Sequence, residues 1–345
     1  MNHSDLELFL KSAIRAKHCI LVQGSPGIGK THIVEQACKA EGAELFYFYV
    51  SISDPTDLKG FGMLVDGKAE FVPFGELRRV YEAIAAGKRV VLFFDDLGQG
   101  APATQASAMS LMDKLKGQCA IFAATNRKED RAGVQGILEP VKSRFHAIVS
   151  LEPDLNEFCN HLLEAGEQRY GLSEDAILDG VSFLRFRPDL LCAFTPTVEI
   201  SNSPCPRTWV AALQQVTLNL PGSIEFEALQ GAIGKGPGGE FAGFKKMRRA
   251  LPNLDGILLD PSKVALPTEA SIRWAVCTGL AAKATEANFP RVHQFAQRLL
   301  DNGQAQFAAL LIRDCTRRTP AIMETAEFQK VCGGPIGDLI TGNYK

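Results

Sequence analysis

Eight consecutive residues near the start of the chain, Gly24–Thr31, have the types and spacing that bind phosphate groups. They follow the pattern G-x-x-x-x-G-K-[ST], in which glycines let backbone N–H groups turn inward around phosphate oxygens. Lys30 is suited to neutralise β- and γ-phosphates, and the Thr31 hydroxyl to ligate Mg²⁺. The residues predicted to contact a nucleotide are Gly24, Ser25, Pro26, Gly27, Ile28, Gly29, Lys30, Thr31 and His32.

Two adjacent carboxylates, Asp95 and Asp96, follow the apolar run Val90–Phe94. Adjacent carboxylates at the end of a buried strand are costly unless they face a cation. We therefore interpret Asp95 as a Mg²⁺ ligand, acting through water, and Asp96 as the group that orients and activates an attacking water. A solvated turn is the simpler alternative.

The elements that must position these groups alternate between apolar strands and helices. Fully apolar strands separated by helices are typical of a parallel sheet covered on both faces, with the ligand beyond the carboxyl ends of the strands. The phosphate-binding segment, Asp95-Asp96 and Thr125-Asn126 all fall at such ends. The predicted strands are Cys19–Val22, Leu45–Ile52, Arg89–Leu97, Cys119–Asn126 and Phe145–Leu151, and the clearest helices are Gly75–Ala86 and Pro102–Leu115.

The order of these elements resembles the AAA+ ATPases and, within that superfamily, is most similar to the MoxR-type group. The resemblance implies that Asn126 places the lytic water, as the sensor 1 residue does. It implies that Arg144 is the arginine finger, which acts on the nucleotide of the neighbouring subunit. Arg207 resembles the sensor 2 arginine at the start of a lid helix. Arg127 and Arg131 are alternative candidates for the arginine finger, because they lie on the same approach to the nucleotide of the neighbouring subunit.

The resemblance implies an α/β fold: a P-loop AAA+ core with a five-stranded parallel sheet between helices, then a helical lid and a mostly helical C-terminal extension. We place these domains at 1–152, 153–222 and 223–345. A hairpin around Asp66-Gly67, within an insert near 60–74, resembles the MoxR-type insert that faces a central pore. An ordinary surface hairpin is the alternative.

The resemblance further implies a ring, most often hexameric, that binds ATP and Mg²⁺ between subunits and remodels a partner protein. In this family the partner is often a von Willebrand factor A domain protein. One departure concerns Asp96, because the superfamily usually has Glu there; the shorter side chain reaches the water less well. Two alternative functions stay open: a nucleic-acid motor or loader, and a slow nucleotide-dependent switch.

Composition favours a soluble cytoplasmic enzyme. The formal net charge of −2 argues against a generally basic surface for nucleic acid, and nine scattered cysteines without a C-x-x-C pair favour reduced thiols. No apolar run approaches the length of a membrane span. The glycine-rich stretch 231–239 lacks G-K-[ST] and is interpreted as a flexible linker. Lys245-Lys246 with Arg248-Arg249 is interpreted as a solvated basic face.

Overall fold

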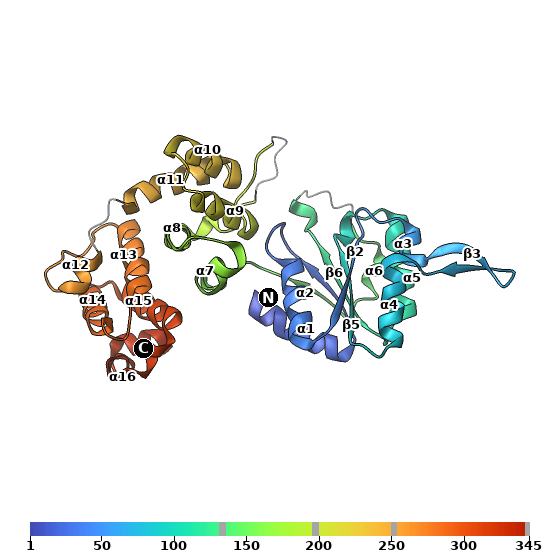
Figure 1. The fold of residues 1–345 in the computed structure, drawn as a ribbon, viewed down its shortest axis with the longest axis horizontal. Coiled ribbons are helices and arrows are strands. Elements are labelled where there is room, and N and C mark those ends of the chain that lie inside the picture. The colour runs from blue at the N-terminus through green and yellow to red at the C-terminus, as the bar shows by residue number, and fades with distance from the viewer. Residues whose placement is uncertain (131–135, 195–199, 250–253, 342–345) are drawn as a thin grey trace. The chain divides into compact units, whose positions relative to one another are not determined.

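The computed structural model describes residues 1–130, 136–194, 200–249 and 254–341 (Figure 1). The chain forms two compact units. The first includes Met1–Glu157 and Cys205–Arg207, and the second includes Phe158–Ala193 and the described chain from Thr208 onwards. Each unit has its own core.

The first unit is built on a five-stranded sheet with the order β2-β5-β6-β1-β7, in which every pairing is parallel. The predicted strands and their parallel arrangement are confirmed, although β2 ends at Tyr49 because the chain turns there. The strand bounds are β1 (Cys19–Gln23), β2 (Glu44–Tyr49), β5 (Val90–Asp95), β6 (Ala120–Thr125) and β7 (Ala147–Ser150).

Helices cover both faces of this sheet, as its fully apolar strands require. On one face of the sheet α1 packs against α2. The opposite face is covered by α3, α4, α5 and α6, which contact one another (Figure 1). Alternate residues of each strand serve the two faces, so Leu92 and Phe94 join the core under α4 and α5. The bounds are α1 (His3–Ala16), α2 (Lys30–Glu41), α3 (Pro55–Lys59), α4 (Gly75–Ala85), α5 (Pro102–Leu115) and α6 (Glu139–Lys142).

A two-stranded hairpin extends from this unit (Figure 1). β3 (Phe61–Val65) pairs antiparallel with β4 (Lys68–Val72), as predicted. Asp66 and Gly67 turn the chain with φ of 49° and 78°, because both positions of this tight turn need the left-handed region. Phe61, Leu64 and Phe71 are 58%, 78% and 63% exposed, so the hairpin carries apolar side chains that its own unit does not bury.

The second unit is helical. Its core includes Phe183 and Trp209 beside Phe241, and a separate cluster in which Phe289, Phe295 and Phe307 are buried. No helix among the described residues is both long and apolar enough to cross a membrane. Two of its helices, α7 (Leu155–Tyr170) and α9 (Pro206–Thr217), begin in the first unit. The others are α8 (Glu174–Phe186), α10 (Gly222–Ile233), α11 (Lys235–Arg249), α12 (Leu254–Leu259), α13 (Ala270–Lys283), α14 (Phe289–Asp301), α15 (Ala305–Arg318), α16 (Ala326–Cys332) and α17 (Pro335–Thr341).

The interpretation of residues 231–239 as a flexible linker is wrong. Only Gly234, with φ of 90°, separates α10 from α11, and the later glycines lie inside α11. A Cβ at Gly238 would come within 2.6 Å of the Gln230 Cα. The glycines therefore let two helix backbones approach each other closely, which is a packing role that sequence composition does not distinguish from flexibility.

The interpretation of the basic cluster is also wrong for Lys245. Its side chain is 2% exposed and forms an ion pair with Glu225 of α10, because a buried ammonium needs a partner. The side chains of Arg248 and Arg249 lie outside the described residues. The division into a lid at 153–222 and an extension at 223–345 stays a prediction.

Candidate functional site

Gly24–Thr31, the segment predicted to bind phosphate, connects β1 to the first turn of α2. Gly27 and Gly29 have φ of 75° and 99°, a backbone region that side chains with a Cβ rarely adopt. A Cβ at Gly24 would come within 2.8 Å of the Leu151 carbonyl oxygen. The glycines are therefore required by the backbone path, which presents the N-terminus of α2 to the solvent edge of the sheet.

The Lys30 ammonium lies inside this loop. Its Nζ donates to the carbonyl oxygens of Gly24 and Ser25, at 2.7 and 2.9 Å, and to Asn126 Oδ1 at 2.7 Å. Lys30 is only 8% exposed. Burial lowers its pKa to about 8, against the opposing influence of the Asp96 and Asp95 carboxylates. The loop thus holds a desolvated cation whose proton is weakly held.

This gives a prediction for the pH dependence of nucleotide binding. The ligand-free protein carries a charged Lys30 below pH 8 and loses that charge above it, so affinity for ATP is expected to fall as pH rises from about 8 to about 10. Titration of binding across this range checks the prediction. A Lys30→Arg variant is the control, because arginine stays charged; an equal fall in that variant would assign the effect to another group.

Thr31 and Asp95 lie side by side. The Thr31 hydroxyl donates to Asp95 Oδ2 at 3.0 Å. A hydroxyl and a carboxylate are hard oxygen ligands of the kind that Mg²⁺ takes together with substrate phosphates and water, so the donor set fits this ion. Thr31 and Asp95 are the residues that would hold it.

Asp96 has an unusual backbone conformation. Its φ and ψ are 53° and 38°, in the left-handed region, and its N–H donates to Asp95 Oδ1 at 3.0 Å. Aspartate tolerates this region better than most residues with a side chain. Burial and the neighbouring Asp95 raise the pKa of Asp96, with Lys30 and Arg207 opposing. A raised pKa makes the carboxylate a better proton acceptor.

The structure brings most of the predicted site residues to one edge of the sheet. Asn126 follows β6 and accepts from Lys30. The Arg207 backbone N–H donates to the Gly27 carbonyl at 3.1 Å, and its charge lowers the pKa of both Lys30 and Asp96. His32 lies in α2 with its Nδ1 3.5 Å from Glu35 Oε2, and Pro26 lies in the turn of the loop.

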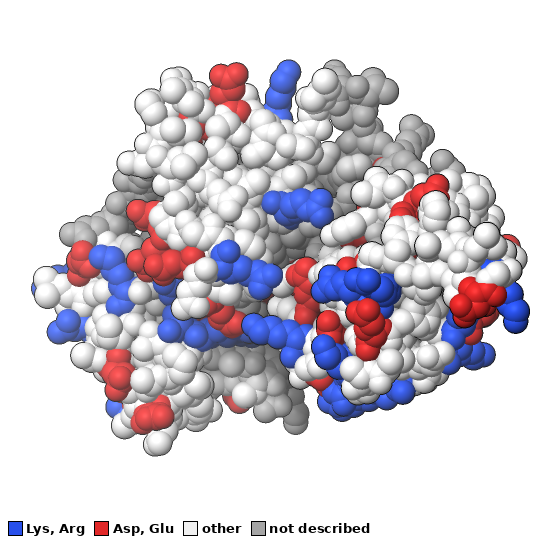
Figure 2. All heavy atoms as spheres, turned by 45° about the vertical axis from the view of Figure 1, so that its right-hand side comes forward, with Lys and Arg blue, Asp and Glu red and all other residues white. Residues whose placement is uncertain are grey.

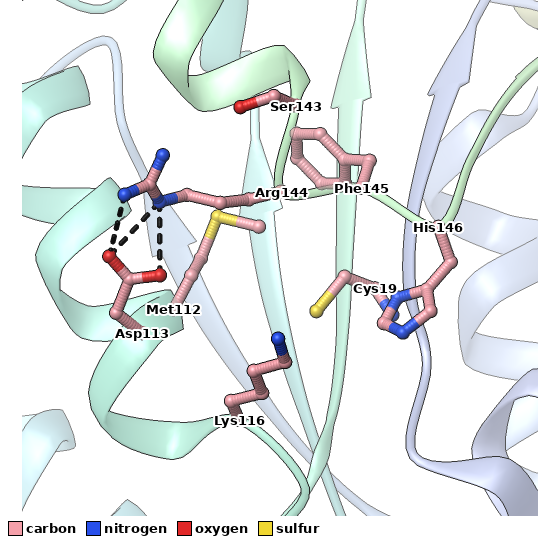
Figure 3. Close-up of a pocket in the computed structure, with 8 residues that line it drawn as sticks. All are labelled: Cys19, Met112, Asp113, Lys116, Ser143, Arg144, Phe145 and His146. Carbon is pink, nitrogen blue, oxygen red and sulfur yellow. Dashed lines mark hydrogen bonds and ion pairs between the residues drawn. The ribbon is translucent and has the colours of Figure 1, made fainter.

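Arg144 lies apart from this site. It precedes β7 and therefore lies at the opposite, amino-terminal edge of the sheet, where it forks onto Asp113 (Figure 3). Of the alternative finger candidates, Arg127 forms ion pairs with Glu152 and Glu129, and Arg131 lies outside the described residues. A role for Arg144 in phosphate chemistry thus requires a nucleotide held by another copy of the chain.

Two residues near the loop were not identified from the sequence. Asp130 Oδ1 accepts from Ser25 Oγ at 3.4 Å, while its buried Oδ2 has no partner among the described residues. Asp130 follows β6, and polar residues after the carboxyl ends of the strands are expected to lie near the ligand. This position is therefore a signal in the sequence that could have identified Asp130. His3 Nε2 donates to the Ile28 carbonyl at 2.7 Å. No sequence pattern links His3 to the loop, since only packing of α1 against α2 brings them together.

A comparison with protein-family models gives one match. Residues 20–152 match the family model described as ATPase family associated with various cellular activities (AAA). Similar solved structures include the Thermotoga maritima RuvB Holliday junction branch migration motor, at 13% identity and a TM-score of 0.41, covering 81% of this chain and 79% of that one. A candidate ATPase from Cytophaga hutchinsonii is 14% identical with a TM-score of 0.36, covering 67% and 80%. No curated protein sequence matches the chain.

Proposed function

This chain carries an AAA ATPase-family domain over residues 20–152, and we propose that it acts as a MoxR-type ring ATPase that remodels a partner protein. The observation that supports this best is the division of the predicted residues between two edges of one sheet. Lys30, Thr31 and Asp95 lie at the carboxyl edge, and Arg144 lies at the other. A complete site then needs two protomers, as in a ring.

The proposed reaction is hydrolysis of ATP by direct attack of water. Lys30 binds the β- and γ-phosphates. Asp96 and Asn126 orient the attacking water, and Asp96 accepts a proton from it. Mg²⁺, held by Thr31 and Asp95, would neutralise charge on the phosphates. The oxygen–phosphorus bond to the water forms as the bond to the leaving ADP breaks. Arg144 of the next protomer and Arg207 stabilise the charge on the transferred group.

The hairpin is the surface that we assign to the partner. Its exposed apolar residues, including Phe61, Leu64 and Phe71, are not buried by their own unit. Apolar patches of this kind mark interaction surfaces. We infer that movement of the hairpin on hydrolysis transmits work to a protein client, with a von Willebrand factor A domain protein as the family precedent. We place this activity in the cytoplasm.

The test is ATP turnover per subunit as a function of protein concentration, with Lys30→Ala as the blank. A finger supplied by a neighbour requires assembly, so specific activity should rise steeply with concentration and then level off, and Arg144→Ala should remove the rise. Constant specific activity would mean a ring complete at every dilution or a self-contained site, which a mass measurement separates. No turnover above the blank would overturn an autonomous ATPase.

A slow nucleotide-dependent switch is a second candidate, because the Asp96 side chain is shorter than glutamate and would reach the attacking water less well. The left-handed backbone at Asp96 also gives a local reason for aspartate, because most side chains cost about 1 kcal/mol there. We expect Asp96→Glu to leave turnover unchanged or lower and to reduce stability slightly. Asp96→Asn, which suits the same backbone, should keep nucleotide binding but lose turnover about a hundredfold or more.

Steady-state kinetics and thermal unfolding of the two Asp96 variants check this prediction. A large gain in turnover for Asp96→Glu would instead indicate a site tuned for slow hydrolysis and would support the switch.

A nucleic-acid motor gains no support from the charged side chains. Lys245, the first residue of the basic cluster predicted from the sequence, is buried against Glu225. On the face drawn in Figure 2, Lys and Arg side chains lie among Asp and Glu side chains. We therefore propose a protein client rather than DNA or RNA.

A further inference from the structure

A pocket lies at the amino-terminal edge of the sheet in the first unit (Figure 3). It is formed by the start of β1, the end of α5, and the segment between α6 and β7, so it is remote from the phosphate-binding loop of the same protomer. The lining residues are Cys19, Met112, Asp113, Lys116, Ser143, Arg144, Phe145 and His146.

The Arg144 guanidinium is held in this pocket by Asp113 and by a backbone carbonyl. Nε donates to both Asp113 oxygens at 3.0 Å, and Nη2 donates to Asp113 Oδ2 at 2.8 Å. Nη1 donates to the Pro140 carbonyl at 2.6 Å. Because a guanidinium has five N–H groups, this arrangement fixes its plane and leaves donors for a further acceptor. Asp113 thus orients Arg144 and also cancels part of its charge.

Lys116 is a second cation in the same pocket. It follows the last residue of α5, and its ammonium is directed into the space between Arg144 and Cys19 (Figure 3). Within the described part of the chain its ammonium has no hydrogen bond or ion pair. Lys116 is exposed, so among the described residues no ion pair holds its ammonium and it is available to a ligand that enters the pocket.

The other polar groups of the pocket do not supply a negative charge. Burial raises the pKa of the Cys19 thiol to about 11, so it is neutral at ordinary pH. His146 Nδ1 accepts from the Cys19 backbone N–H at 2.9 Å, which places the proton of the neutral ring on Nε2 as a donor. Two cations thus face one carboxylate, and the pocket is suited to an anion with several oxygens.

We propose that Lys116 acts in trans with Arg144, binding the terminal phosphate of the nucleotide held by the next protomer, and that Asp113 positions Arg144 for this contact. The inference rests on the proposed function, which puts a triphosphate at the subunit interface. A terminal phosphate carries more charge than one half-neutralised guanidinium can balance, and lysine supplies a compact charge with adjustable donors.

The first experiment compares binding of ATP and ADP at a protein concentration above assembly, in an Asp96→Asn background that does not hydrolyse. We expect Lys116→Met to weaken ATP binding about tenfold, the value of one charge-assisted hydrogen bond, and to leave ADP binding unchanged. Lys116→Arg should restore much of the preference. The matched control is Lys114→Met, because Lys114 lies in the last turn of α5 and is exposed like Lys116, but it does not line the pocket.

The second experiment tests action in trans by mixing Lys116→Met with Lys30→Met protomers. The first variant keeps its own nucleotide site and the second keeps an intact pocket, so mixed rings should exceed the average activity of the two variants measured alone. An absence of gain, or an equal loss of ATP and ADP affinity, would overturn the role of Lys116. If the role of Lys116 fails but the wild type hydrolyses ATP normally in the same assay, the proposed function still stands. If the wild type shows no ATP turnover, both the role of Lys116 and the proposed function are overturned.

Discussion

Replacing Lys30 with methionine is expected to reduce ATP turnover by at least about a hundredfold, which is the effect of removing one preorganised charge-stabilising donor. The Lys30 ammonium is enclosed by the loop that would bind the phosphates. Methionine keeps much of the side-chain volume but has no charge and no donor. Steady-state ATP turnover, measured at a protein concentration on the plateau, checks the prediction.

The fold should survive this change. Burial of the Lys30 charge already opposes folding, so its removal relieves that cost while leaving the oxygens that it contacts without their donor. Circular dichroism and thermal unfolding of the variant are the controls. Turnover close to that of the wild type would contradict the assignment of the loop. If the methionine variant is unfolded, Lys30→Ala takes its place, because alanine also lacks the charge and the donor.

Replacing Asp314 with alanine is expected to destabilise the second unit by about 3–5 kcal/mol, the cost of leaving a buried charge without its partner. Asp314 of α15 binds Arg185 of α8 in a two-pronged ion pair, with Nη2 donating to Oδ1 at 2.9 Å. The two side chains are 4% and 2% exposed, in the order Arg185 and Asp314. Solvent therefore cannot replace the lost carboxylate.

The chain offers a direct optical measurement of this effect. Its two tryptophans, Trp209 and Trp274, both lie in the second unit, so urea unfolding followed by tryptophan fluorescence reports on that unit. Arg317→Ala is the matched control, because Arg317 lies on the same helix and its pair with Glu164 is 35% and 57% exposed. That change should cost no more than about 1 kcal/mol.

A double replacement, Arg185→Met with Asp314→Leu, distinguishes the buried charge from simple loss of packing. It removes both charges and keeps apolar volume, so it should recover most of the stability lost in Asp314→Ala. If the double variant is as unstable as Asp314→Ala, the packing of these two side chains, rather than the compensation of their charges, stabilises the second unit.

The sequence by itself determined the first unit and the carboxyl edge of its sheet. Short apolar runs between helices can be buried only in a parallel sheet, and the polar residues that end those runs must then meet. Lys30, Thr31, Asp95 and Asn126 lie together for this reason. The hairpin followed from the Asp66-Gly67 turn, because few other residue pairs adopt its backbone conformation.

Only the tertiary structure decided features that depend on groups distant in the chain. The depressed pKa of Lys30 requires burial, and the fork between Arg144 and Asp113 joins two elements that no periodicity relates. The left-handed backbone of Asp96 likewise cannot be derived from its side chain. Sequence patterns report the local conformational preference of each residue and the face of the helix or strand that it occupies. They do not report which surfaces meet in the folded protein. The close helix approach at Gly238 and the charge compensation in the Lys245 ion pair depend on those meetings.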